Sequence, residues 1–238
     1  MRGHTGCVLS LALLPDGELA SASEDCDIRI WNISNFSHIT NEILIGHNHS
    51  VRSLAVLSDG NLASGSGDCT IRIWNTKTLQ TNQILTGHSG WVDILVILSN
   101  GTLASGSKDT TIRIWDTKTG QTLRTLTGHT DCVKSLVVLT DDSIASCSVD
   151  RSIRIWNFKN GENIKKFPEY DSPVVSLAVL SDRILAAGCM DKTILILNTI
   201  TGQALKKFLG HTAPVSFLTV LLDGRLVSCS FDSTIKIW

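Results

Sequence analysis

Serine, histidine and aspartate occur in the middle of the sequence at a spacing that could support acyl-transfer chemistry. Ser105 could act as the nucleophile, His88 as its general base and Asp109 as the carboxylate that orients the histidine. The chain has no Gly-x-Ser-x-Gly turn, in which hydrolase serines often stand. A hydrolase needs one activated serine in one pocket, yet equivalent serines recur four residues before other aspartates, at Ser21, Ser64, Ser146 and Ser228. This repetition makes a hydrolase the least favoured function.

A repeat of about 41 residues organises these side chains and runs through the whole chain. Its loop position is a histidine after glycine in five copies and a tyrosine in the fifth: His4, His47, His88, His129, Tyr170 and His211. An aspartate follows 21 residues later in every copy, and a tryptophan, or once a leucine, six residues after that. The chain therefore contains six repeats, at about 1–43, 44–84, 85–125, 126–166, 167–207 and 208–238.

Each repeat has the pattern of four short β-strands. In the second repeat we expect strands at 51–57, 62–66, 71–74 and 83–86, with tight turns at 58–60 and 68–70. No window has a helical period over ten or more residues. The sequence therefore predicts an all-β protein built from four-stranded antiparallel sheets.

A single four-stranded sheet exposes two apolar faces, so each repeat must stack on its neighbours. Closing such a stack into a ring predicts a β-propeller of six blades in one domain, 1–238. The last repeat stops at Trp238, so we expect its blade to lack the outer strand. Three explanations stay open: the chain is a fragment, the ring closes with a three-stranded blade whose edge can pair with another molecule, or a further repeat lies outside it.

The repeat resembles the WD-repeat β-propeller family, whose unit has Gly-His near its start and Trp-Asp at its end. The third repeat matches in full with Gly87-His88 and Trp115-Asp116, whereas three repeats end in Trp-Asn. The resemblance implies a structural hydrogen-bond network within each blade. Its expected members are His4, Ser21, Asp25, Trp31, His47, Ser64, Asp68, Trp74, His88, Ser105, Asp109, Trp115, His129, Ser146, Asp150, Trp156, Asp191, His211, Ser228, Asp232 and Trp238.

The fifth repeat loses this set of polar residues together. Tyr170 replaces histidine, Ala187 replaces serine, Leu197 replaces tryptophan, and Cys189 replaces a second serine. A cooperative buried network predicts such concerted loss, because a partly satisfied network is worse than none. We expect Asp191 to remain because it holds the turn through its own hydrogen bonds, and the fifth blade to be the softest.

The Gly-His loop and the aspartate turn should meet at one rim of each blade, the face that relatives in this family often use for peptides. The residues three and five after the loop position, and the one before the aspartate, differ most between repeats. The expected partner-binding residues among them are Arg52, Trp91, Asp93, Lys108, Lys134, Val149, Met190 and Phe231.

Trp91 is the only tryptophan outside the third-strand position, and two interpretations of it stay open. It is either an exposed anchor for a partner or a side chain buried against the adjacent blade. The basic residues Arg52, Lys108 and Lys134 fall on three consecutive blades, and Val149, Met190 and Phe231 should form an apolar arc. We expect a peptide or protein segment with acidic or phosphorylated groups beside an apolar anchor.

Composition and charge narrow the kinds of partner, bound group and cellular location to expect. Twenty-one Lys and Arg against 22 Asp and Glu give a net charge of −1, so we expect neither nucleic acid nor membrane as a partner. The seven cysteines are an odd number without a Cys-x-x-Cys pair, so we expect no disulfide framework, no metal site and no cofactor. No apolar leader is present, so we expect a cytoplasmic or nuclear protein.

These observations favour a non-catalytic scaffold for protein–protein interaction, without setting its oligomeric state. The alternative is a structural or regulatory propeller fragment of a larger multidomain protein. An enzyme would need a polar pocket outside the repeat pattern, and the sequence has no such feature.

Overall fold

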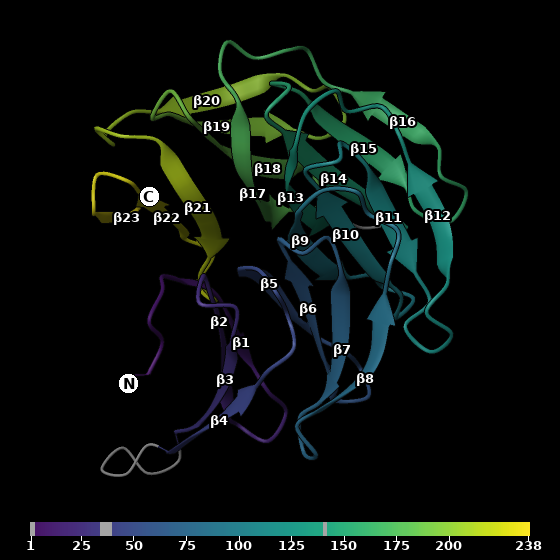
Figure 1. The fold of residues 1–238 in the computed structure, drawn as a ribbon. Coiled ribbons are helices and arrows are strands. Elements are labelled where there is room, and N and C mark those ends of the chain that lie inside the picture. Colours follow the sequence, from purple (N-terminus) through teal and green to yellow (C-terminus); the bar gives the residue numbers. More distant parts are fainter. Residues whose placement is uncertain (1–2, 34–39, 140–141) are drawn as a thin grey trace. The chain divides into compact units, whose positions relative to one another are not determined.

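The computed structural model describes residues 3–33, 40–139 and 142–238, which form twenty-three strands and no helix. The chain divides into two compact units, Met1–Thr125 and Leu126–Trp238. Within every sheet, strands that follow each other along the chain lie side by side and pair antiparallel (Figure 1). No helical segment of the described ranges could cross a membrane.

The first unit carries three sheets of four strands, which we call blades one to three. Blade one contains β1 (Val8–Leu13), β2 (Leu19–Ser23), β3 (Ile28–Asn32) and β4 (Thr40–Leu44). Blade two contains β5 (Val51–Val56), β6 (Leu62–Ser66), β7 (Ile71–Asn75) and β8 (Gln80–Leu85). Blade three contains β9 (Val92–Ile97), β10 (Leu103–Ser107), β11 (Ile112–Trp115) and β12 (Thr122–Leu126).

The second unit carries blades four to six, and the last of them has three strands, which confirms the expectation for the final blade. Blade four contains β13 (Val133–Val138), β14 (Ser143–Ser148), β15 (Ile153–Asn157) and β16 (Asn163–Lys166). Blade five contains β17 (Val174–Ser181), β18 (Ile184–Cys189), β19 (Ile194–Asn198) and β20 (Ala204–Phe208). Blade six contains β21 (Val215–Val220), β22 (Leu226–Ser230) and β23 (Ile235–Ile237).

The outer strand of blade two differs from the expectation. The sequence predicts a strand at 83–86, but β8 begins at Gln80. The Asn75 side chain accepts hydrogen bonds from the amides of Lys77 and Thr78, each at 2.9 Å, and closes the preceding turn early. The first residues of β8 are polar and alternate between exposed and half-buried, so they lack the hydrophobic pattern that predicts a strand.

Each blade has two apolar faces that play different parts in the stack. The leading face consists of the residues 18, 24 and 26 positions after the loop position, which in blade four are Cys147, Ile153 and Ile155. The trailing face consists of the residues 4, 7 and 15 positions after it, which in blade five are Val174, Leu177 and Leu185.

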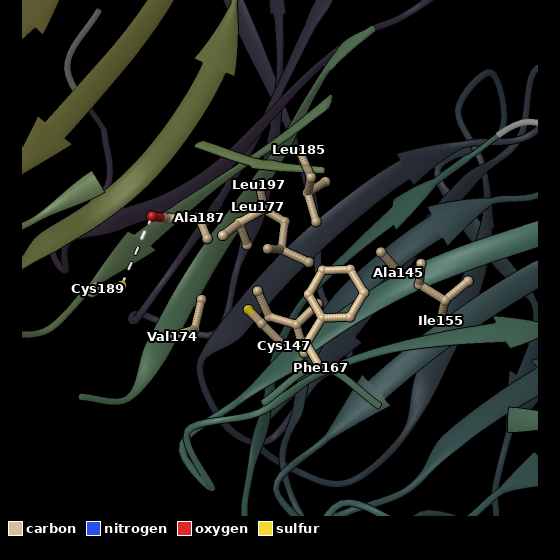
Figure 2. Close-up of a cluster of buried hydrophobic side chains, with 11 residues drawn as sticks. Ala145, Cys147, Ile155, Phe167, Val174, Leu177, Leu185, Ala187, Cys189 and Leu197 are labelled. Atoms are coloured by element: carbon tan, nitrogen blue, oxygen red, sulfur yellow. Dashed lines mark hydrogen bonds between the residues drawn. The ribbon is translucent and has the colours of Figure 1, made fainter. Parts of the chain in front are cut away.

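A leading face packs against the trailing face of the next blade at four junctions inside the two units. Figure 2 shows the junction of blades four and five, where the Phe167 ring lies between Leu177 and Leu197 of blade five and Ala145 and Ile155 of blade four. The cores therefore form between blades rather than inside one sheet.

Candidate functional site

The Gly-His loop and the aspartate turn are joined through the backbone in every blade. The amide of the residue before the aspartate donates a hydrogen bond to the carbonyl three residues after the loop position, at 2.8–3.1 Å. These pairs are Glu24–Cys7, Gly67–Ser50, Lys108–Trp91, Val149–Cys132, Met190–Pro173 and Phe231–Pro214. The two segments thus lie side by side at one end of each blade, which we call the rim.

A β-bulge marks the first strand of every blade at this rim. In blade two, Val51 lies opposite Ser66 and Ser53 opposite Gly65, so Arg52 is the extra, unpaired residue. A bulge re-aims its side chain and commonly occurs beside functional sites. No pattern in the sequence predicts this irregularity. It falls on the residue five after the loop position: Leu9, Arg52, Asp93, Lys134, Val175 and Ser216.

Below the rim, four side chains form a linear hydrogen-bond network in five of the blades. The histidine Nδ1 lies 2.7–2.9 Å from the aspartate Oδ2, and its Nε2 lies 2.6–2.7 Å from the serine Oγ. The tryptophan Nε1 donates to the same Oγ at 2.7–2.9 Å. Because an indole N–H can only donate, the serine hydroxyl is free to donate to Nε2, which assigns the Nδ1–H tautomer to the histidine.

The order Asp, His, Ser is that of a catalytic triad, but the serine oxygen is occupied and enclosed. Ser64, Ser105, Ser146 and Ser228 are fully buried, and Ser21 is 3% exposed. A nucleophilic serine must present Oγ to a substrate with an available lone pair. Here the tryptophan N–H binds that oxygen, so the arrangement holds the loop, the second strand and the third strand together.

Burial and hydrogen bonding together set the pKa values of the aspartates and of His129 in this network. Burial acts to raise the pKa of Asp150, but the hydroxyl of Ser152, the amide of Thr130 and the His129 side chain outweigh it and lower this pKa to about 2. Asp25 also has a pKa of about 2, because the Thr5 amide and His4 outweigh burial. Burial lowers the pKa of His129 against the opposing effect of Asp150.

Acid should therefore destabilise the fold. Both kinds of group have a lower pKa in the folded chain than in the unfolded chain, so the unfolded chain binds more protons as the pH falls. We expect the free energy of unfolding to decrease from about pH 6.5 through His129, and further between about pH 5 and pH 2 through the aspartates. Denaturant titrations at pH 7.5, 5.5 and 3.5 measure this decrease.

The variant Asp150→Asn provides the control for the acid effect. It should be less stable at neutral pH, and it should lose about 1–2 kcal/mol less than the wild type between pH 5 and pH 2. An acid slope identical to that of the wild type would show that Asp150 does not contribute.

Blade five lacks the network but keeps its turn. Asp191 accepts hydrogen bonds from the amide and hydroxyl of Thr193 at 3.1 and 2.6 Å. The Tyr170 hydroxyl is buried and has no hydrogen-bond partner among the described residues. Burial raises the pKa of Cys189 to about 12, so its thiol stays protonated.

At the junction of blades four and five, a larger side chain on blade four compensates for the tryptophan that blade five lacks. Blade three presents Trp115 to Leu85 of blade two, whereas blade five presents the smaller Leu197 to the larger Phe167 of blade four. Sequence reasoning missed Phe167, although its signal was present: the equivalent outer-strand residue of the first three repeats is leucine.

On the rim of the first unit, four expected residues, Trp91 among them, form one cluster. The guanidinium carbon of Arg52 lies 5.0 Å from the Trp91 ring centroid, and Lys108 Nζ lies 4.4 Å from it. Arg52 also forms an ion pair with Asp93, whose side chain is 4% exposed. The indole is therefore a half-buried platform with a cation–π contact to each of two basic groups.

His49 is a further member of this cluster that sequence reasoning missed. Its ring centroid lies 5.1 Å from that of Trp91. Together with Arg52 it packs Trp91 against blade two, the adjacent blade, and the indole is half-buried there; its use as an anchor for a partner stays a prediction. A histidine two residues after the loop histidine of the second repeat was the available signal.

The second unit holds the other four expected rim residues. Lys134 and Val149 are half-buried, whereas Met190 is 45% and Phe231 is 75% exposed. All seven cysteines are free thiols. Within the described ranges, no group of three or more His, Cys, Asp or Glu side chains could hold a metal ion.

Comparison with known proteins gives a consistent result. The model of the family described as "WD domain, G-beta repeat" matches residues 1–32, 39–75, 79–116, 120–157 and 202–238. The solved WD40 beta propeller domain of Doa1 is 26% identical and superposes with a TM-score of 0.90, covering 100% of this chain and 80% of that one. No curated protein sequence matches. The family model passes over 158–201, which holds most of the degenerate fifth repeat.

Proposed function

Because this chain belongs to the WD domain, G-beta repeat family and has the six-bladed β-propeller fold, we propose that it is a non-catalytic scaffold that binds a protein or peptide segment on its rim. Domains of this family generally act as platforms for protein interaction. The finer proposal is that the segment carries acidic or phosphorylated groups beside an apolar side chain.

The cluster around Trp91 carries this proposal. A half-buried indole in contact with two basic groups can take an apolar side chain on the part that is still exposed. Lys108 is exposed, and its ammonium can bind a carboxylate or phosphate beside that part. Asp93 offsets the charge of Arg52, so Lys108 supplies most of the attraction for an anionic group.

The networks beneath the rim support a non-catalytic function. Their serines are enclosed, and each Oγ receives a tryptophan N–H, so none of them is poised to attack a substrate. The same four residue types recur in five of the six blades, where they tie the loop to the second and third strands. Their geometry therefore accounts for them without a reaction.

An array of acidic, phosphorylated and matched neutral peptides tests the proposal. We expect selective binding of anionic peptides that contain an aliphatic or aromatic residue, and at least a tenfold weaker affinity for the variants Trp91→Ala and Lys108→Glu. Lys118→Glu is the matched control, because this exposed lysine lies on the turn before β12 at the opposite end of blade three.

The outcomes of this experiment separate the two candidate functions. Binding that Lys118→Glu leaves unchanged and Trp91→Ala abolishes supports the rim scaffold. An array without selective peptides, or with binding that neither rim variant alters, would instead favour the structural or regulatory alternative.

A further inference from the structure

A hollow at the junction of blades four and five lies wholly within the second unit, at the end of the blades opposite the rim. Its volume is about 420 Å³, which is in the range of pockets that hold small molecules. The turn after β17 and the turn after β19 both border it. Its apolar lining includes Leu139, Ile155, Ile164 and Ile200.

The turn after β17 carries a basic residue that no other repeat has at this place. The residue 13 positions after the loop position is glycine in the first, second, third and sixth repeats and aspartate in the fourth, but it is Arg183 in the fifth. In blade five the strands pair as far as Ser181 and Ile184, so the turn has two residues and does not need a glycine with positive φ like Gly60. The Arg183 side chain is exposed and makes no hydrogen bond or ion pair with any residue that the structure describes.

The turn after β19 carries an apolar residue where other repeats have a charged one. The residue 30 positions after the loop position is lysine in the second, third and fourth repeats, but it is Ile200 in the fifth. Ile200 is 57% exposed, although residues of tight turns are usually polar. Two departures from the repeat therefore meet at one hollow, and both occur in the fifth repeat.

Ile164 supplies a second exposed aliphatic wall, from blade four. Ile155 pairs with Lys165 and Trp156 with Asn163, so Ile164 is the extra residue of a β-bulge in β16. A bulge re-aims its side chain, and Ile164 is 53% exposed where it lines the hollow. Ile155 is 7% exposed, so the hollow combines a buried apolar base with two exposed aliphatic walls.

Two hydrogen bonds hold these walls in place. The Thr199 amide donates to the Arg183 carbonyl at 2.9 Å and joins the two turns. The Lys165 ammonium donates to the Ile200 carbonyl and joins the second turn to β16 of blade four. Because the walls are already fixed, a ligand loses little free energy in ordering them.

We propose that this hollow binds a small monocarboxylate with an apolar body of about six to ten carbon atoms. The body lies on Ile155, Ile164 and Ile200, and the carboxylate accepts hydrogen bonds from the Arg183 guanidinium. Arg183 and Lys165 outnumber Asp182, the acidic residue of the lining, so the charge at the hollow favours an anion over a cation. This site is separate from the rim and goes beyond the scaffold function.

NMR titration of the isotope-labelled protein with sodium octanoate tests the proposal. Octanoate should shift the amides of 182–184 and 199–202 along a saturable curve, with a Kd of about 1 mM or lower. Octan-1-ol has the same chain without the charge, and acetate has the charge without the chain. Octanol should therefore bind at least about fivefold more weakly than octanoate, and acetate should not saturate the site.

Two variants separate the charge from the apolar wall. Arg183→Gln should weaken octanoate binding at least about fivefold and leave octanol binding unchanged, whereas Ile200→Gln should weaken both. Lys192→Gln and Leu209→Gln are the matched controls, because they replace an exposed lysine and an exposed leucine at the other end of the second unit. Both controls should bind octanoate like the wild type. All four residues are exposed, so the variants should unfold at the temperature of the wild type.

Three results would overturn the proposal. The absence of a saturable shift at the two turns would exclude the site. Equal affinity for octanoate and octanol, or an Arg183→Gln variant that binds octanoate as tightly as the wild type, would show that Arg183 does not recognise the carboxylate. A peptide ending in leucine that shifts these amides where octanoate does not would replace the small acid by a peptide terminus. None of these outcomes depends on peptide binding at the rim.

Discussion

Replacing Ser146 by alanine should lower the free energy of unfolding by about 2–4 kcal/mol. The Ser146 hydroxyl is fully buried and contacts His129 Nε2 at 2.7 Å and Trp156 Nε1 at 2.8 Å. Alanine leaves both nitrogens in place without a partner, and each unpaired buried polar group costs about 1–3 kcal/mol. Equilibrium denaturation in urea measures the change.

A double-mutant cycle identifies the cause of this loss. Trp156→Phe removes the indole N–H, so it should cost less in the Ser146→Ala background than in the wild type. Ser89→Ala, at an exposed serine, should change stability by no more than about 0.5 kcal/mol. Strictly additive costs for Ser146→Ala and Trp156→Phe would mean that the two side chains act independently, against the network interpretation.

Repetition made the fold predictable from the sequence. Six copies of one spacing, filled by histidine, aspartate and tryptophan in five of them, show which residues are loops, turns and third strands, because every copy tests the same alignment. The stretch 62–66 was correctly placed as a strand for that reason. The start of β8 was not, since its alternating polar residues resemble those of a loop.

Contacts between blades were harder to predict, because they depend on residues one repeat apart. Arg52 and Asp93 are 41 residues apart at the same repeat position, and only the stacking of blades brings the opposite charges together. The β-bulge under both residues has no signature in a single repeat. The sequence therefore located the rim residues but not their pairing.

Hydrogen exchange should show blade five to be the least protected of the four-stranded blades in the second unit. We expect the slowest amides of β18 and β19 to exchange at least tenfold faster than those of β14 and β15, which corresponds to about 1.4 kcal/mol less local stability. The reason is that blade four ties its loop to two strands through His129, Ser146 and Trp156, whereas blade five has no such tie. Native-state exchange followed by mass spectrometry resolves these strands.

Rebuilding the network in blade five tests whether its absence is the cause. Tyr170→His, Ala187→Ser and Leu197→Trp restore the three polar side chains missing around Asp191, but the new indole would meet Phe167, which already fills the junction with blade four. The triple variant should therefore be overpacked and lose about 1–3 kcal/mol. Adding Phe167→Leu restores the leucine–tryptophan pairing that Leu85 and Trp115 make elsewhere, and protection in β18 and β19 should then rise to the level of blade four. The quadruple variant has both the network and its leucine packing partner. If its β18 and β19 amides still exchange as fast as those of the wild type, the low protection of blade five has another origin.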